Sequence, residues 1–170
     1  MDIWLETSLN GLYDNILKAF PETQKRQNAV DEVKIEHLLW VPFRGMNTLF
    51  VKAQARRDES KNECMILFKK VKYHPSAGRG LVELRASNGE VVFLETLSSE
   101  KTEVLVRCTC EDFHWRMTHF NKLDGSLYGR DRRKYEAKFR PGSSNPEELA
   151  GVCKHLIKMS RVLGESSIVR

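Results

Sequence analysis

The chain has 170 residues, of which 41% are hydrophobic and 30% are charged, and its formal net charge at pH 7 is +5. This length allows one domain with a substantial core, no apolar run reaches the length of a membrane span, and the acidic start M-D-I-W-L-E-T is unlike a secretory signal. We therefore expect a cytoplasmic protein without a membrane partner, in a compartment where paired cysteines indicate a metal before a disulfide.

The first expected element is an amphipathic helix over Leu5–Phe20. Its apolar residues recur at helical spacing, and at 100° per residue Leu9, Leu12 and Ile16 fall within about 40° of the first leucine. Pro21 would end the helix because proline cannot continue the backbone hydrogen bonding. Such a stripe packs into the core of its own chain or docks onto a partner, and the sequence leaves both interpretations open.

From about Val33 the apolar pattern changes to a period of two, which is typical of strands. The expected strands are Glu32–Trp40, Thr48–Arg57, Cys64–Lys72, Leu81–Ser87, Glu90–Thr96 and Glu103–Arg107. Asn88-Gly89 favours a hairpin, because a type I′ turn needs positive φ at both central residues. Consecutive strands joined by short turns predict a mainly antiparallel sheet.

Helical spacing returns after Cys110 and breaks at Asp124-Gly125. Residues 129–145 read as a basic, loop-like insertion. A last helix is expected from about Cys153 to Leu163, with Gly164 at the position where a left-handed residue often ends a helix.

Three of the four cysteines stand in two compact groups, C-T-C at 108–110 and C-K-H at 153–155. On an extended backbone Cys108 and Cys110 share a face, so both sulfurs can bind one ion. On a continuous helix Cys153 and His155 would point about 200° apart. We therefore expect Cys153 at the bend before the last helix, where the helix N-terminus also favours a thiolate, and His155 in the first turn.

Three thiolates and one imidazole form a closed tetrahedral set, which suits one structural zinc ion and leaves no position for a substrate water. The expected ligands are Cys108, Cys110, Cys153 and His155. Cys64 stands apart in the sequence, and we expect a half-buried cysteine on a strand edge that does not bind the metal.

The pattern C-x-C followed by C-x-H resembles the SWIM-type zinc finger, a small β-β-α module. The resemblance rests on the four expected ligands together with Asp112-Phe113 and Lys154, and it covers roughly the last third of the chain. It implies zinc ligation at those four positions and, more loosely, a DNA-binding or protein-binding role. The 42-residue spacer is long for this family.

The whole chain also resembles small SWIM-bearing structural proteins of tailed bacteriophages. In those proteins a C-x-C-x-D-F segment precedes an N-P…G-x-C-K-H-L segment, here Asn145-Pro146 and Gly151–Leu156. This resemblance implies a subunit that is made in the cytoplasm of a host cell and incorporated into a virion.

Two groups of basic residues could contact nucleic acid or a protein partner. Most of the positive excess lies in residues 108–170. The insertion contributes Arg130, Arg132, Arg133 and Lys134, interleaved with aromatic residues that suit exposed bases. The last helix contributes Lys154, Lys158 and Arg161 on one outward stripe, which a solvated helix face would explain equally well.

The predicted fold is α+β, with an N-terminal helix, a mainly antiparallel sheet and a zinc-clamped strand-to-helix unit at the C-terminus. Residues 1–107 would form the helix and sheet, and residues 108–170 the SWIM-like unit, within one compact domain. Nucleophile-elbow, Walker and H-E-x-x-H motifs are absent from the sequence, so we expect no enzyme and no small-molecule substrate. We expect a non-catalytic zinc-stabilised module in a protein assembly, with nucleic-acid binding as the alternative.

Overall fold

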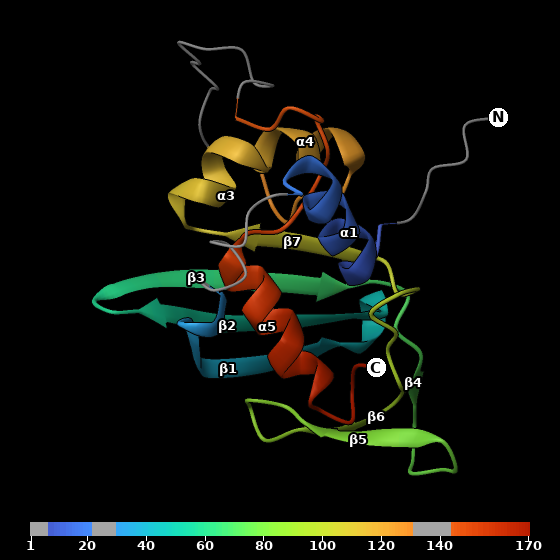
Figure 1. Ribbon diagram of the computed structural model, residues 1–170. Helices are drawn as coiled ribbons and strands as arrows, with labels where there is room; N and C mark the ends of the chain where they lie inside the picture. Colours follow the sequence, from blue (N-terminus) through green and yellow to red (C-terminus); the bar gives the residue numbers. More distant parts are fainter. Residues whose placement is uncertain (1–6, 22–29, 131–143) are drawn as a thin grey trace, which may run out of the picture.

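Figure 1 shows the computed structural model of the chain, which describes residues 7–21, 30–130 and 144–170. The fold is α+β, with an N-terminal helix, antiparallel sheets and a C-terminal helix, as the sequence predicts. The elements are α1 Leu9–Ala19, β1 Lys34–Phe43, η1 Arg44–Met46, β2 Thr48–Arg57, β3 Ser60–Phe68, β4 Tyr73–His74, β5 Leu81–Arg85, β6 Val91–Glu95, β7 Val104–Cys108, α3 Glu111–Arg116, α4 Thr118–Asp124 and α5 Lys154–Gly164.

The strands form two antiparallel sheets, whereas the sequence suggested one. The larger sheet has the order β1-β2-β3-β7, and the smaller sheet has the order β4-β6-β5. The third expected strand was placed too late in the chain, because β3 begins at Ser60 and ends at Phe68. Its first residues, S-K-N-E, are polar and exposed or half-buried, so they give no apolar alternation to read.

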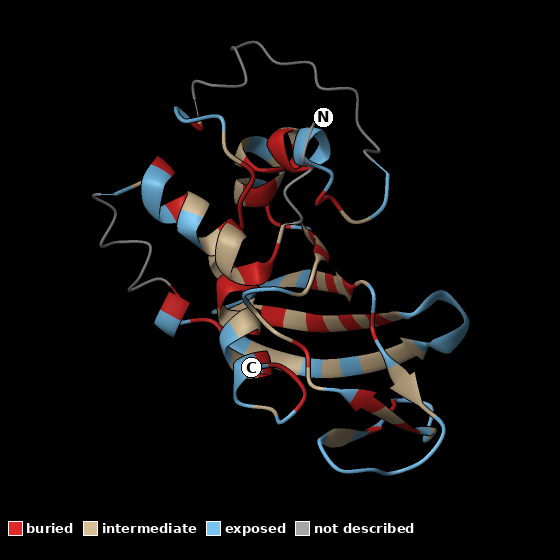
Figure 2. Cartoon of the chain, turned by 90° about the vertical axis from the view of Figure 1, so that its right-hand side faces the viewer, coloured by how far each residue is buried: buried red, intermediate tan, exposed pale blue. Residues whose placement is uncertain are grey.

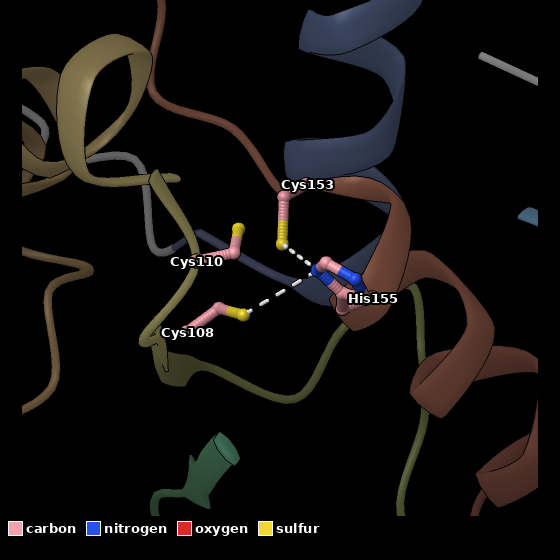
Figure 3. A group of neighbouring side chains, drawn as sticks. All are labelled: Cys108, Cys110, Cys153 and His155. Atoms are coloured by element: carbon pink, nitrogen blue, oxygen red, sulfur yellow. Dashed lines mark hydrogen bonds between the residues drawn. The ribbon is translucent and has the colours of Figure 1, made fainter. Parts of the chain in front are cut away.

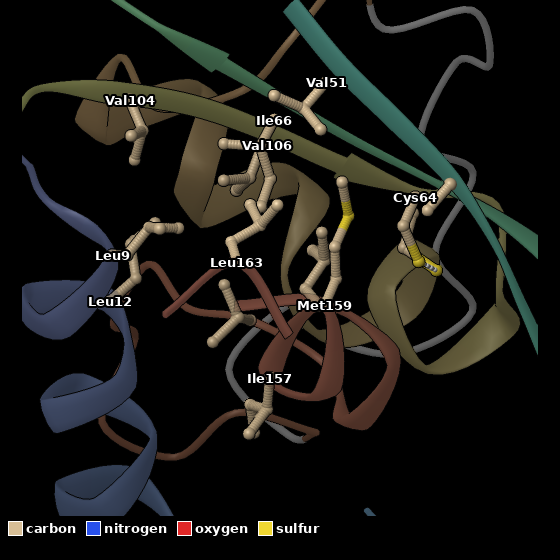
Figure 4. Close-up of a cluster of buried hydrophobic side chains, with 14 of the residues drawn as sticks. Leu9, Leu12, Val51, Cys64, Ile66, Val104, Val106, Ile157, Met159 and Leu163 are labelled. Atoms are coloured by element: carbon tan, nitrogen blue, oxygen red, sulfur yellow. Dashed lines mark hydrogen bonds between the residues drawn. The ribbon is translucent and has the colours of Figure 1, made fainter. Parts of the chain in front are cut away.

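The main core lies between α5 and the inner face of the larger sheet (Figure 4). Along β2 every second residue is buried, as the pleat of a strand requires when one face is covered (Figure 2). The residues that meet there include Val51, Ile66 and Val106 from the sheet and Leu156, Met159 and Leu163 from the helix. The last helix is therefore packed on strands from the first half of the chain.

Helix α1 packs into this core, which decides between the two interpretations of its apolar stripe. Ser8 caps the helix, and its hydroxyl accepts a hydrogen bond of 3.1 Å from the backbone N–H of Gly11. Leu9, Leu12 and Ile16 are all at most 5% exposed. From Leu9 on, the stripe is thus part of the chain's own core and is not a free docking surface, whereas Leu5, with which the predicted helix began, lies outside the described residues.

Both borders of the larger sheet are partly covered. The edge strand β1 carries Pro42, has a register shift between Glu36 and Leu39, and exchanges hydrogen bonds at Trp40 with Ser87. On the other side, the backbone of Val106 in β7 bonds to residues 126–128. The backbone groups that would otherwise be unpaired at a sheet border are therefore partly used.

The outer face of the larger sheet carries apolar side chains that stay partly exposed. They occupy alternate positions of its four strands, opposite the core face. We call them the outer apolar face: Leu39, Val41, Phe43, Phe50, Met65, Leu67 and Leu105. Leu39 and Phe43 are 43% and 44% exposed, and Tyr128 stacks on Phe50 with ring centroids 5.2 Å apart.

Candidate metal centre

The first pair of expected ligands lies where β7 runs into α3. Cys108 is the last residue of β7, and Cys110 caps the N-terminus of α3 with extended backbone angles, φ −71° and ψ 153°. This extended stretch keeps both sulfurs on one side of the chain. The Cys110 sulfur accepts a hydrogen bond of 3.3 Å from the backbone N–H of Phe113, which fixes its direction.

The second pair lies at the start of α5, as the spacing requires. Cys153 is the N-cap residue, with φ −80° and ψ 170°, and His155 follows in the first turn. Cys153 is fully buried and His155 is 3% exposed. The bend at Cys153 turns its sulfur toward the imidazole, so the two side chains do not point apart as they would on a continuous helix (Figure 3).

The structure brings these four side chains together around one point. The sulfurs of Cys108, Cys110 and Cys153 and a ring nitrogen of His155 all lie within 4.8 Å of one another. The Nδ1 atom of His155 is 3.8 Å from the Cys108 sulfur and 3.9 Å from the Cys153 sulfur (Figure 3). Zinc–sulfur bonds of about 2.3 Å and zinc–nitrogen bonds of about 2.0 Å place tetrahedral ligand atoms roughly 3.5–3.8 Å apart. The donor set and its spacing therefore fit a single ion.

Without a cation, the three thiols cannot all lose their protons. Hydrogen bonds from the thiols of Cys108 and Cys153 hold the pKa of Cys110 far below its ordinary value. The contact with Cys110 raises the pKa of Cys108, and burial raises the pKa of Cys153. The site thus favours one thiolate and two thiols, and a divalent cation would stabilise the remaining two in ionised form.

Cys64 is not where the sequence suggested. It is fully buried on an internal strand, β3, and stands directly opposite Cys108 of β7. Its sulfur lies 3.7 Å from the Cys108 sulfur, toward which its thiol donates a hydrogen bond. It remains outside the set of four mutually close donors, so the prediction that Cys64 is not a ligand is consistent with the geometry.

Three asparagines hold the segment that leads into Cys153, and the sequence analysis missed their role. Asn145 bonds to both backbone groups of Leu149, the Asn15 amide donates to the carbonyl of Ala150 at 2.9 Å, and Asn121 bonds to both backbone groups of Gly151. Asn121 and Asn145 are completely buried. Such side chains replace the backbone partners that an irregular segment lacks.

Gly151 itself has no room for a side chain. A Cβ atom there would lie 2.3 Å from Cδ1 and 2.9 Å from Cγ1 of Ile16, and 3.2 Å from the Met117 sulfur. The approach to the second ligand pair therefore passes in close contact with α1. The available sequence signal was the N-P…G-x-C-K-H-L segment, whose asparagine and glycine have these structural roles.

The predicted basic contact residues are described only in part. Arg132, Arg133 and Lys134 lie outside the described residues, while Arg130 is exposed. On α5, Lys154 and Lys158 are half-buried, and the exposed Arg161 forms an ion pair of 3.2 Å with Asp31.

A solvent-open cavity of about 580 Å³ adjoins the metal centre on the side of Cys108. Thr109, His114 and Trp115 line it, together with Arg107 and Arg130. Trp115 is 51% exposed, and the imidazole of His114 meets its ring edge-on at 4.7 Å. The guanidinium of Arg107 is held by the backbone carbonyls of Tyr128, at 2.6 Å, and Arg130, at 2.7 Å.

Comparison of the chain with protein-family models, with curated proteins and with solved structures found no match in any of the three. In the described part of the chain, every helix is too short or too polar to cross a membrane.

Proposed function

We propose that the chain binds one zinc ion through Cys108, Cys110, Cys153 and His155, and that the ion has a structural role. The observation that carries this proposal is the convergence of four donor atoms within 4.8 Å. All four residues are at most 7% exposed. A buried Cys₃His set fills a tetrahedral coordination sphere, whereas catalytic zinc sites keep one position open for water or substrate.

The zinc ion would connect the turn that joins β7 to α3 with the start of α5, which lies far along the chain. Apparent binding free energies of structural zinc in finger peptides are about 10–16 kcal/mol, comparable with the whole stability of a domain. The ion would therefore fix α5 on the sheet and stabilise the fold. This role needs no catalytic group, and we propose that the protein is not an enzyme.

We further propose that the module serves as a subunit of a protein assembly. The support is the outer apolar face, where Leu39 and Phe43 remain exposed among half-buried neighbours. Charges beside this face are paired within the chain, as in the 2.8 Å bridge between Lys52 and Glu63. A mainly apolar surface with internally paired charges suits protein contact better than phosphate contact. A phage virion, which the sequence resemblance implies, is one such assembly.

Nucleic-acid binding is the second candidate. It is supported by the cavity beside the zinc ligands, where an exposed tryptophan, Trp115, lies near Arg130. Exposed bases stack on aromatic rings, and a nearby cation attracts phosphate.

Zinc content tests the first proposal. The protein should be purified without chelator, and its metal should be measured by elemental mass spectrometry against protein concentration. We expect one zinc per chain in the wild type and in Cys64→Ala, but little or none in Cys153→Ser. The Cys64→Ala variant is the matched control, because it removes a neighbouring sulfur that is not a ligand. A wild-type protein that contains no zinc and binds none on addition would refute the proposal.

Sedimentation and DNA retardation separate the two partner classes. An assembly subunit should associate with itself or with a co-expressed neighbour at both low and high salt, and Leu39→Glu with Phe43→Glu should weaken that contact. Leu123→Glu is the control, because Leu123 is 66% exposed and lies on α4, outside this face. Each neutralised phosphate instead lowers log affinity by about 0.7–0.9 per log unit of salt. Salt-sensitive DNA binding without protein association would favour the second candidate.

A further inference from the structure

Cys64 is the sulfur that the zinc proposal does not use. It is fully buried, and its thiol lies 3.7 Å from the sulfur of Cys108. With Cys108, Cys110, Cys153 and His155 completing a tetrahedral set, this fourth thiol has no coordination position. A free thiol is thus in contact with a residue expected to be a metal-bound thiolate.

The backbone holds Cys64 and Cys108 in a position that suits a covalent bond. They are direct partners in the antiparallel pairing of β3 with β7. The adjacent pair, Glu63 and Thr109, carries a ladder hydrogen bond, from the Thr109 N–H to the Glu63 carbonyl at 3.0 Å. Cys64 and Cys108 therefore form a non-hydrogen-bonded pair, in which Cα atoms lie about 4.5 Å apart and side chains approach most closely. That separation falls within the range of disulfides, about 4.4–6.8 Å.

We propose that hydrogen peroxide converts Cys64 and Cys108 into a disulfide, and that the centre then releases its zinc. The proposal rests on the zinc site proposed above. Once joined to Cys64, the sulfur of Cys108 is no longer a thiolate, so the ion keeps only Cys110, Cys153 and His155. The disulfide needs no refolding, because the pairing of β3 with β7 already places Cys64 opposite Cys108.

The chemistry balances with peroxide as the oxidant. The Cys108 thiolate attacks one peroxide oxygen, the O–O bond breaks, and a sulfenic acid and hydroxide form. The Cys64 sulfur then attacks the Cys108 sulfur, the S–O bond breaks, and water leaves with the Cys64 proton. Two electrons pass from the two sulfurs to peroxide. Cys108 is one of the residues that border the solvent-open cavity, while its side chain lies on the core face of β7 and is 4% exposed.

Two other sulfur pairs are less suited to be the first product. Cys108 and Cys110 are separated by one residue, and a bond between them would strain the extended turn that joins β7 to α3. Cys110 and Cys153 belong to different helix ends, and both are expected to be held by the ion while zinc is present. Of the four cysteines, only Cys64 is not expected to bind the ion.

Peptide mapping with zinc-release kinetics tests the proposal on the full, zinc-loaded chain. After its zinc content is recorded, the protein is treated with a small excess of hydrogen peroxide, and released zinc is followed with a chelating dye. Free thiols are then blocked, and the chain is digested with trypsin without reduction. We expect the peptide Asn62–Lys69 to be joined to the peptide Cys108–Arg116, and fragmentation on either side of Thr109 identifies the bonded sulfur.

The variant Cys64→Ser keeps a hydrogen-bond donor but cannot form the bond. It should release zinc several-fold more slowly than the wild type. Treatment with reductant and added zinc should restore the zinc content of the oxidised wild type, because the disulfide is reversible, but should not restore zinc that the variant has lost. A first product that joins Cys110 to Cys153, or equal release rates in the two proteins, would overturn the proposal. If the variant does not fold, the wild-type map still decides. Absence of zinc before oxidation would refute the zinc proposal instead, while the cross-link map would still report on this pair.

Discussion

Asn121 and Gly151 exchange two hydrogen bonds across 30 residues of sequence. The side-chain amide of Asn121 donates to the carbonyl of Gly151 at 3.0 Å, and the N–H of Gly151 donates to the side-chain oxygen at 2.9 Å. The asparagine is fully buried in α4. It therefore serves as the backbone partner of a residue two positions before a predicted zinc ligand, and it fixes where the second ligand pair enters the site.

Replacement of Asn121 by alanine should destabilise the protein by about 2–4 kcal/mol, because both backbone groups of Gly151 would be buried without partners. Urea unfolding of the zinc-loaded protein measures the change. Asn62→Ala is the control, since Asn62 makes an exposed hydrogen bond to Ser60, and its cost should stay within about 0.5 kcal/mol. If the two variants lose the same free energy of unfolding, then water molecules must replace the hydrogen bonds of Asn121 to Gly151.

Gly151→Ala should be destabilising because of its contact with Ile16, and a double-mutant cycle isolates that contact. The new methyl group would meet the Ile16 side chain at 2.3 Å, an overlap that typically costs about 1–3 kcal/mol. In the background of Ile16→Ala the same glycine replacement should cost much less, which gives a coupling energy above about 0.5 kcal/mol.

Gly45→Ala is the control for that cycle, because nothing lies within 4 Å of a Cβ at Gly45. It should have the same small effect with or without Ile16. If the losses of unfolding free energy for Gly151→Ala and Ile16→Ala simply add in the double variant, then contact with Ile16 is not the reason that position 151 requires glycine.

Glu103 should stabilise the fold only above acidic pH. Its carboxylate accepts a hydrogen bond of 2.6 Å from the Lys69 ammonium, and this contact holds the pKa of Glu103 below its ordinary value. A pKa that is lower in the folded than in the unfolded chain gives stability that is complete above the unfolded value, and this stability is lost as the pH falls through the folded value.

The variant Glu103→Gln should therefore be less stable than the wild type at pH 7, and the difference should shrink as the pH falls below about 4. Thermal unfolding at several pH values gives the stability difference between the two proteins. Any loss of zinc at acidic pH affects both proteins and therefore cancels in this difference. Glu100→Gln, at an exposed position, should differ little from the wild type throughout. A difference for Glu103→Gln that persists undiminished at low pH would exclude the ion pair as its cause.

Removal of zinc with a chelator should weaken the sheet as well as the region after Arg107. Leu156 and Met159 of α5 are fully buried in the same core as the inner face of the larger sheet, so the loss of α5 would expose that face. Loss of several kcal/mol should lower Tm by more than about 10 °C in a single transition. Hydrogen exchange followed by mass spectrometry would show increased exchange in both β3 and α5. Two separate transitions would instead show that residues 1–107 fold on their own.

Local patterns in the sequence predicted the helices and most of the strands, because each depends on neighbours a few residues away. Thr48–Arg57 was placed with the bounds that the structure has, since its alternation is strong. The four converging donors were also predictable, because Cys108 and Cys110 constrain each other locally and the pair at 153–155 lies at a helix start.

Features that depend on distant pairing were not predictable in this way. Cys64 lies opposite Cys108 only because β7 joins the sheet next to β3, and no local pattern records that strand order. The role of Asn121 depends on a backbone segment 30 residues away, and an asparagine within a helical pattern reads as a solvated residue. The division into two sheets likewise depends on which strands pair with each other, rather than on the propensity of any single strand.

The partly covered borders of the larger sheet limit how copies of this chain can join. A strand from another molecule would need free backbone groups along β1 or β7, but Pro42 offers no N–H, Ser87 bonds to Trp40, and residues 126–128 cover Val106. Growth of a continuous intermolecular sheet, the route to fibrils, is therefore hindered at these positions of the sheet. Copies that associate elsewhere on the surface would meet through side chains, and the symmetry of that contact would decide whether the assembly closes at a defined size or grows as a filament.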